Sequence, residues 1–212
     1  MAPILCYVTD SAALPERETD LLAVIRCAIR AGVDWIQIRE KNLSGRALSA
    51  LAREAVSAAQ GSATRVLING RLDVAIAAGA GGVHLGGDAL PVADVAAWCA
   101  RHATPDFLVG ASCHSLEESQ AAARDGAHYI FFGPVFSTPA KIQSGPPQGA
   151  ARLEEVCRAV RIPVLAIGGI TQQNARECLR VGAAGIAAIR LFQESKDLAG
   201  AVNELRNAGN RG

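Results

Sequence analysis

A run of alternating polar residues is the first segment that could do chemistry. Within WIQIREK, residues 35–41, Gln37, Arg39 and Lys41 occupy every second position. Alternate side chains of an extended chain point to the same face, so these three are expected to point together. An amide beside two cations is a set of hydrogen-bond donors that suits an anion. The segment therefore predicts an anion-binding face inside a largely apolar chain.

A second anion site is predicted near the end of the chain. IGGIT, residues 167–171, follows a β-rich run and leads through Gly168 and Gly169 into a helical pattern. Bare backbone N–H groups at a helix N-terminus bind phosphate. Ile189 ends the last β-rich run, and the guanidinium of Arg190, directly after it, could add a charged fork at the same place. A tight turn and a solvated arginine are the alternative interpretation.

The elements that must position these residues alternate along the chain. Eight short β-rich runs are separated by stretches with helical periodicity, such as LLAVIRCAIRAG and VADVAAWCARH. The runs are ILCYV (4–8), DWIQI (34–38), RVLI (65–68), GVHL (82–85), FLVGA (107–111), YIFF (129–132), VLAI (164–167) and GIAAI (185–189). Strands separated by helices pair in parallel, because each crossover needs a helix.

This alternation predicts the α/β class and a single-domain (β/α)8 TIM barrel spanning residues 1–212. A doubly wound open sheet is the runner-up. The even number of strands and the absence of G-x-G-x-x-G after the first strand weigh against it. Four predicted helices run into Gly before the next strand, as expected for left-handed C-caps, and Ser115 with Glu118 resembles a capping box.

Barrel enzymes carry their chemistry at the C-terminal ends of the strands. The residues expected there, besides the two anion sites, are Asn69, His84, the Ser112–His114 run and the stretch from Gly133 to Lys141. This collection is basic and polar, with few carboxylates, and fits an anionic ligand.

Composition limits the function classes. Hydrophobic residues make up 50% and aromatic residues 4% of the chain, which suits parallel strands covered by helices. The net charge of +1 gives no reason to expect binding to nucleic acid or to a membrane. The N-terminus lacks a signal peptide pattern and no apolar run approaches a membrane span, so a cytoplasmic protein is expected.

The six cysteines form no C-x-x-C pair and have no zinc-ligand spacing with a histidine. Cys27, Cys99, Cys157 and Cys178 lie in Ala-rich helical patterns and are expected to be core thiols.

The motifs QIREK, INGRLDVA, GVHLGG, GASCHSLEE, YIFFGPVFSTPAK, VLAIGGI and AGIAAI occur in this order. Their order and approximate spacing, from about Tyr7 to Phe192, resemble those of thiamine phosphate synthase and its TenI-type relatives. The resemblance implies thiamine biosynthesis, with a phosphorylated heterocycle (thiazole phosphate or thiamine phosphate) as the small-molecule partner.

The resemblance also assigns substrate contacts. Gln37, Arg39 and Lys41 match the family motif Q-x-R-x-K, which binds diphosphate and pyrimidine. The other matching positions are Asn69 for the pyrimidine, Ser112, Thr138 and Lys141 near the diphosphate, and Gly168 and Gly169 for the thiazole phosphate. The implied synthase reaction is dissociative: diphosphate leaves, and the thiazole nitrogen captures the pyrimidine cation. Such a reaction needs positive charge rather than a protein nucleophile.

The sequence departs from the synthases at the metal. Their two Mg²⁺-binding aspartates correspond here to Gly70 and Ala89, with Asp88 one position early. No metal ligand is therefore predicted. Mg²⁺ is the expected cofactor if the chain is a synthase, and none is expected if it is a tautomerase.

The sequence also departs from the TenI-type thiazole tautomerases, which share its Asn69–Gly70 step. Their catalytic histidine corresponds to Pro134. A general acid or base would then come from His84 or His114, because imidazole titrates near neutral pH. For His114, helix capping or a backbone hydrogen bond is an equal expectation.

Three hypotheses follow. The favoured one is a TenI-type thiazole tautomerase, and the alternatives are a thiamine phosphate synthase and a non-catalytic phosphate-binding regulatory paralogue. A homodimer is considered because Ala-rich helix faces are expected to be exposed. SGPPQG suggests a hinge in the loop 137–148, which could close over a ligand.

Overall fold

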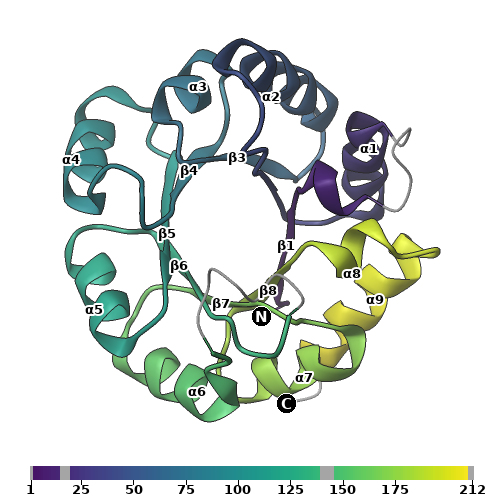
Figure 1. Cartoon of the computed structure of the whole chain (residues 1–212), viewed down its shortest axis with the longest axis vertical. Coiled ribbons are helices and arrows are strands. Elements are labelled where there is room, and N and C mark those ends of the chain that lie inside the picture. Colours follow the sequence, from purple (N-terminus) through teal and green to yellow (C-terminus); the bar gives the residue numbers. More distant parts are fainter. Residues whose placement is uncertain (1, 15–19, 139–145, 210–212) are drawn as a thin grey trace.

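The computed structural model describes residues 2–14, 20–138 and 146–209. Parallel strands close into a barrel in which each strand pairs with the next and β8 pairs with β1 (Figure 1). The strands are β1 (Ile4–Val8), β2 (Trp35–Ile38), β3 (Arg65–Asn69), β4 (Gly82–Leu85), β5 (Leu108–Cys113), β6 (Tyr129–Phe132), β7 (Val164–Ile167) and β8 (Gly185–Ala188). The predicted (β/α)8 barrel is confirmed, and the open sheet is excluded by the β1–β8 pairing.

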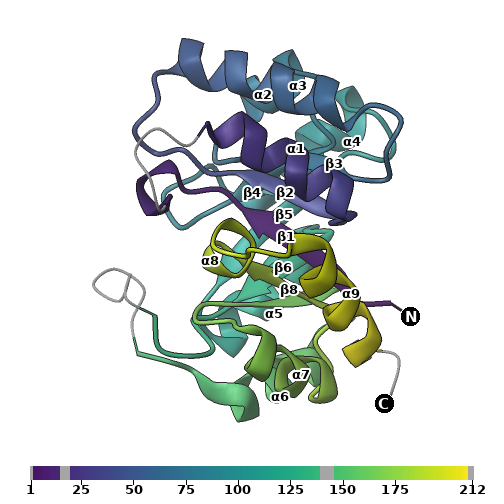
Figure 2. The ribbon, with the colours of Figure 1, turned by 90° about the vertical axis from the view of Figure 1, so that its right-hand side faces the viewer.

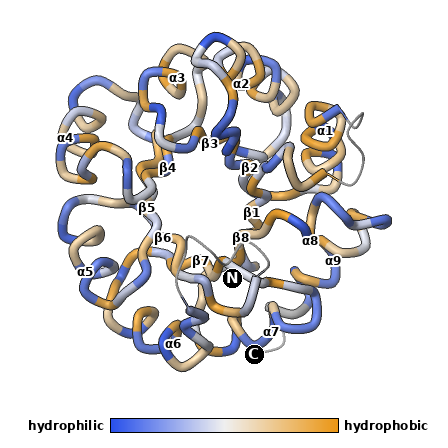
Figure 3. Tube along the Cα trace, viewed as in Figure 1, coloured by the Kyte–Doolittle hydropathy of each residue, from blue (hydrophilic) through white to orange (hydrophobic). Residues whose placement is uncertain are grey.

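Helices surround the barrel and flank it on both sides (Figure 2). They are α1 (Leu21–Ala31), α2 (Gly45–Ala59), α3 (Leu72–Ala77), α4 (Val92–His102), α5 (Leu116–Arg124), α6 (Gly149–Ala159), α7 (Gln172–Arg180), α8 (Arg190–Gln193) and α9 (Leu198–Gly209), with a 3-10 turn η1 (Ser11–Ala13) after β1. Along each helix, hydrophobic and hydrophilic segments alternate (Figure 3), as expected for one face packed on the strands.

The core has two parts because strand side chains alternate between the barrel interior and the helices. The interior is filled by Cys6, Val8, Leu67, Tyr129, Phe131, Leu165 and Ala187. The Tyr129 ring needs Gly110 on the neighbouring strand, since a Cβ there would lie 2.1 Å from a ring carbon. Three of the chain's few aromatic rings, those of Trp35, Tyr129 and Phe131, thus pack together in the barrel interior.

The predicted strand runs match within one or two residues, and those at 4–8, 82–85, 129–132 and 164–167 match fully. The predicted glycine C-caps are confirmed, because Gly32, Gly79, Gly126 and Gly182 all have positive φ. The capping box at Ser115 is half formed: its hydroxyl accepts from the Glu118 N–H, while the Glu118 carboxylate accepts from the N–H of His114.

The prediction for the helical cysteines is only partly right. Cys99 and Cys178 are buried, Cys157 is half-buried, and Cys27 is exposed. Cys27 lies on the outer face of α1, between the buried residues Ile25 and Ala28, because Ala-rich composition does not show which face a residue occupies. No helix in the described ranges has the length and apolar character needed to cross a membrane.

Candidate active site

Two amides meet at the carboxyl ends of β2 and β3. The Gln37 Nε2 donates to Asn69 Oδ1 at 2.9 Å, and Gln37 is buried. This bond fixes the orientation of both groups. It leaves the Gln37 carbonyl and the Asn69 amide N–H groups as an acceptor and a donor. Both residues were predicted at strand ends, and the structure brings their side chains together there.

A buried histidine joins the next strands. His84 Nδ1 lies 3.1 Å from the Tyr129 hydroxyl, and its Nε2 lies 2.9 Å from the Ser112 hydroxyl. Burial, with a smaller contribution from the charge of Arg39, lowers the pKa of His84 from 6.5 to about 3. The imidazole is therefore neutral at physiological pH. With both nitrogens committed to protein hydroxyls, it is poorly suited to the acid–base role proposed from sequence.

The β1 and β2 ends are tied together by a residue that the sequence reading passed over. Glu40 is buried and accepts from the Thr9 and Ser11 hydroxyls, each at 2.6 Å. The Ser11 N–H also bonds its carboxylate, and the Arg39 N–H donates to the Thr9 hydroxyl. Glu40 falls between the alternate polar positions of QIREK, on the opposite face. In the sequence, Glu40 could have been noticed as a carboxylate between two cations. Its partners Thr9 and Ser11 follow β1 and come close to it only in the folded barrel.

Lys41 does not extend the β2 face. The strand ends at Ile38, and Lys41 is exposed in the turn that follows, so the alternation no longer applies there. Arg39 is half-buried and Lys41 is exposed. The shared orientation predicted for Gln37, Arg39 and Lys41 is therefore not supported at the third position. Lys141 lies outside the described residues, as does most of the loop 137–148.

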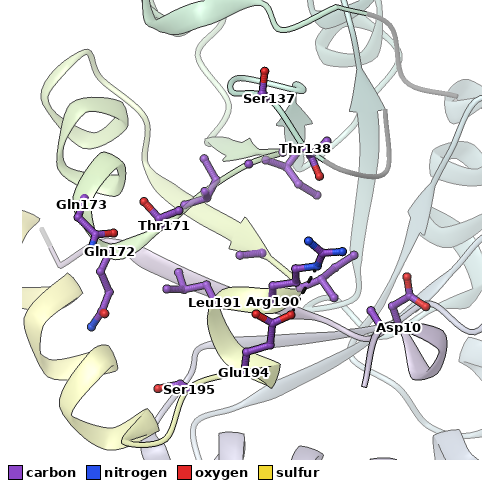
Figure 4. A pocket seen from close by; sticks show the side chains of 17 residues that line it. Asp10, Ser137, Thr138, Thr171, Gln172, Gln173, Arg190, Leu191, Glu194 and Ser195 are labelled. Atoms are coloured by element: carbon purple, nitrogen blue, oxygen red, sulfur yellow. Dashed lines mark ion pairs between the residues drawn. The ribbon is translucent and has the colours of Figure 1, made fainter. Parts of the chain in front are cut away.

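A cavity of about 490 Å³ opens beside the ends of β7 and β8. Its lining includes Gly168, Gly169, Ile189, Arg190 and Thr138 (Figure 4). The predicted second anion site and one residue of the sixth loop thus meet in one cavity. Ser137, next to Thr138, also lines it.

The glycine pair makes this cavity possible. Gly168 and Gly169 have φ of 92° and 66°, a region that favours glycine. A Cβ on Gly169 would lie 2.5 Å from the Ser137 carbonyl oxygen, so the neighbouring segment packs where a side chain would be. Within the described residues, no hydrogen bond occupies the backbone N–H groups of Gly169 and Ile170. These groups remain available to an anion.

The helix that follows begins as predicted, but it caps itself. Thr171 is the N-cap of α7, and Asn174 completes a capping box with it. The Asn174 amide also donates to the Gly169 carbonyl at 2.9 Å. Asn174 was not predicted from the sequence. Its side-chain oxygen accepts from the Thr171 N–H, a backbone donor at the helix start that was expected to bind phosphate. The glycine loop, rather than the first turn of α7, carries the free N–H groups.

Arg190 supplies a cation to the same cavity. Its Nε lies 3.5 Å from the Glu194 carboxylate, and both side chains are about half exposed, so the pair contributes little to stability and can be replaced by an anion. Figure 4 shows this pair with Thr138 and Asp10 around it. Gln193, also on α8, accepts from the Tyr7 hydroxyl at 3.0 Å and from the Asp10 N–H at 2.9 Å. It holds α8, and with it Arg190, against the end of β1.

His114, the other histidine proposed as an acid or base, has a structural partner, and three further residues offer no replacement. His114 Nδ1 bonds the Gly133 carbonyl at 2.5 Å, which was one of the two expectations for it. His128 accepts from the Val109 N–H. Cys113 is buried, which raises the pKa of its thiol to about 12 and keeps it neutral. Pro134 follows a cis peptide bond and stands where a tautomerase histidine was sought.

The donors at the ends of β3 and β4 do not fit a two-carboxylate magnesium site. Gly70 has no side chain and a φ of 69°. Ala89 is half-buried against the core, and Asp88 is exposed beside it. Mg²⁺ prefers hard oxygen ligands and usually takes one or two carboxylates. These turns offer a single carboxylate, Asp88.

Comparison with known proteins agrees with the fold and the motifs. Residues 5–192 match the family model described as thiamine monophosphate synthase. The chain is 41% identical over 186 residues to the thiamine-phosphate synthase of Roseiflexus castenholzii, covering 88% of this chain and 79% of that protein. It is 37% identical to the thiamine-phosphate synthase of Shouchella clausii, covering 97% and 96%. The solved thiamine phosphate pyrophosphorylase from Pyrococcus furiosus aligns with a TM-score of 0.82 at 33% identity, covering 97% of this chain and 95% of that one. The chain belongs to the thiamine monophosphate synthase family.

Proposed function

We propose that this protein is a thiamine-phosphate synthase. It joins hydroxymethylpyrimidine diphosphate to a thiazole phosphate, with release of diphosphate. One observation carries the proposal: polar groups gather at two separate places in the barrel mouth, one at β2–β5 and one at β7–β8. A reaction that joins two phosphorylated halves needs both places.

The β7–β8 cavity takes the thiazole phosphate. The backbone N–H groups of Gly169 and Ile170 and the guanidinium of Arg190 are its donors. At the other end, Gln37 and Asn69 present an acceptor and donors to the pyrimidine. Arg39 and Ser112 lie with them at the strand ends and take the diphosphate, with Lys41, Thr138 and Lys141 as the further contacts that the family likeness assigns.

In the proposed reaction these residues stabilise the negative charge of the leaving diphosphate. Diphosphate leaves from the pyrimidine methylene, and the thiazole nitrogen captures the resulting cation. Preorganised donors around the leaving group lower this barrier without a protein base. The relatives, named as synthases, favour this reading over the tautomerase that we preferred from the sequence.

The hydrogen bonds of the histidines also favour the synthase over the tautomerase. A tautomerase must move a proton at the ring. His84 is neutral with both nitrogens bonded, His114 bonds a backbone carbonyl, and Pro134 offers no acid or base. Thiazole tautomerisation therefore has no clear proton carrier among these residues.

A second candidate is favoured by Gly70 and Ala89. A chain without the usual carboxylates can bind both halves and still fail to couple them. This candidate is a non-catalytic protein that binds thiazole phosphate or thiamine phosphate.

One assay separates these functions. The protein is incubated with hydroxymethylpyrimidine diphosphate and thiazole phosphate, with saturating Mg²⁺ or with EDTA, and thiamine phosphate is quantified. Product in the Mg²⁺ reaction supports the synthase, and no product at saturating Mg²⁺ excludes it. Calorimetric binding of thiazole phosphate without turnover would then support the binding protein. Faster aromatisation of the thiazole carboxylate phosphate without metal would instead restore the tautomerase.

A further inference from the structure

An apolar patch lies on the outside of the barrel, away from the cavity at β7–β8. Within the described residues the large hydrophobic side chains that are exposed are Leu43, Ile76, Leu90 and Trp98. Three of them, Ile76, Leu90 and Trp98, line one hollow of about 590 Å³ beside α3 and α4. We call these three residues the α3–α4 patch. Leu90 is 60% exposed, and clustered exposure of this kind marks an interaction site.

The charged groups in the hollow are already paired. Arg71 donates to Asp73 through two bonds of 2.8 Å and 2.6 Å, and both residues line the hollow. Because Arg71 and Asp73 neutralise each other, the residues that line the hollow carry no net charge. The hollow therefore suits an apolar protein surface better than a small anion.

The exposed face of α4 carries a charge pattern that is complementary to itself. Asp94, Ala97, Trp98 and Arg101 are all exposed and have the spacing i, i+3, i+4 and i+7 that places residues on one helix face. A negative charge therefore lies about one turn before Trp98 and a positive charge about one turn after it. A twofold interface requires that residue i meets j and that j meets i.

We propose that two copies of this chain associate through the α3–α4 patch and the exposed face of α4. The twofold axis passes beside Trp98, so the two α4 helices run antiparallel. Asp94 of each copy then faces Arg101 of the other, and two ion pairs form. Ala97 lets the helices approach to the 8–10 Å that is usual for packed helices. Trp98 of each copy packs against Trp98 of the other beside the axis, and Leu90 of each copy lies against the C-terminal end of the partner's α4.

The first test uses the charges. Two single variants, Asp94→Arg and Arg101→Asp, are purified, and their masses are measured by light scattering at micromolar concentration. The wild-type chain of 22.0 kDa is expected at twice its mass. Each variant alone is expected at the monomer mass, because every cross-contact then joins like charges.

The decisive sample is an equimolar mixture of the two variants. In the mixed dimer, Arg at position 94 faces Asp at position 101, and Arg101 faces Asp94, so both pairs are restored and the dimer mass should return. The double variant Asp94→Arg/Arg101→Asp should likewise dimerise with itself. Leu90→Ser should weaken the dimer without adding a charge beside either ion pair.

Arg26→Asp is the matched control. Arg26 is exposed on α1, which lies across the barrel from α4 (Figure 1), and this change should leave the dimer intact. Circular dichroism confirms that each variant is folded. A monomeric wild type overturns the proposal, and so does a mixture that stays monomeric. Because no arm measures catalysis, these outcomes are independent of the proposed synthase activity.

Discussion

His84 Nε2 lies 2.9 Å from the Ser112 hydroxyl oxygen, and this contact sets the direction of the serine proton. Tyr129 is buried among apolar side chains, and His84 is its hydroxyl's partner within the described residues. A buried hydroxyl proton is costly to leave unpaired, so Tyr129 donates to Nδ1. A neutral imidazole then carries its proton on Nε2 and donates to Ser112. The Ser112 proton is left for a ligand oxygen.

The hydrogen bonds from Tyr129 to His84 and from His84 to Ser112 predict that a change at Tyr129 affects ligand binding at Ser112. Tyr129→Phe removes the group that fixes the imidazole tautomer, so His84 can accept from Ser112 and withdraw its proton from the site. We expect kcat/KM for the pyrimidine diphosphate to fall about tenfold, the value of one hydrogen bond of about 1.4 kcal/mol. Ser112→Ala should give a loss of similar size.

Tyr7→Phe is the control, because Tyr7 is equally buried and its hydroxyl bonds Gln193 instead. Tyr7→Phe should lower the free energy of unfolding and leave kcat/KM for the pyrimidine diphosphate nearly unchanged. Nitrogen-15 shifts of the imidazole report the tautomer directly. If Tyr129→Phe binds and reacts as wild type while Ser112→Ala does not, the proposed proton direction is wrong.

The lowered pKa of His84 predicts how stability depends on pH. Between pH 6.5 and about 3 the unfolded chain binds a proton at this residue and the folded protein does not, so stability falls as pH falls. The slope from one such group approaches about 1.4 kcal/mol per pH unit. Denaturant unfolding of wild type and His84→Gln from pH 7 to pH 4.5 should therefore show a difference that shrinks as pH falls through about 6.5. Parallel curves would contradict the buried neutral imidazole.

The glycine loop makes a matched pair of variants available. Gly169 and Gly79 have nearly equal φ, 66° and 67°, so alanine costs about 1–2 kcal/mol of backbone strain at either position. Only at Gly169 does the new Cβ meet neighbours, at 2.5 Å and 2.8 Å, whereas at Gly79 nothing lies within 4 Å. We expect Gly169→Ala to raise the Kd for thiazole phosphate about tenfold or more and Gly79→Ala to leave it unchanged, as measured by calorimetry. Equal affinities for the two variants would place the phosphate elsewhere.

Much of this arrangement was readable because the relevant signals are periodic. A strand period of two against a helix period of 3.6, with glycines between, predicts the barrel. Because barrel enzymes carry their sites at the C-terminal ends of the strands, Gly168, Gly169 and Arg190 are expected at the same mouth of the barrel, and they line one cavity there. Lys41 was misjudged because the alternation does not show where β2 ends.

Other features depend on pairings that one sequence does not reveal. The burial of His84 depends on Tyr129, which lies two strands away and needs the space left by Gly110. Gln193 and Glu40 hold loops from distant parts of the chain. Gln193 and Glu40 meet their partners because β1 pairs with β8 and with β2. That pairing follows from closure of the barrel and not from the sequence pattern of a single segment.

The β3 and β4 ends allow the metal interpretation to be tested by restoring carboxylates. Gly70→Asp is feasible, because a Cβ there meets nothing within 4 Å and aspartate enters the left-handed region more readily than most residues. With Ala89→Asp it supplies two carboxylates in addition to Asp88. We expect the double variant to bind Mg²⁺ in a calorimetric titration and to form thiamine phosphate with a steeper dependence on Mg²⁺ than wild type. Gly70→Asn/Ala89→Asn has the same backbone strain and nearly the same shape without the charges, and should gain neither property. A double aspartate variant that is folded and indistinguishable from the asparagine control would show that these positions do not face the metal.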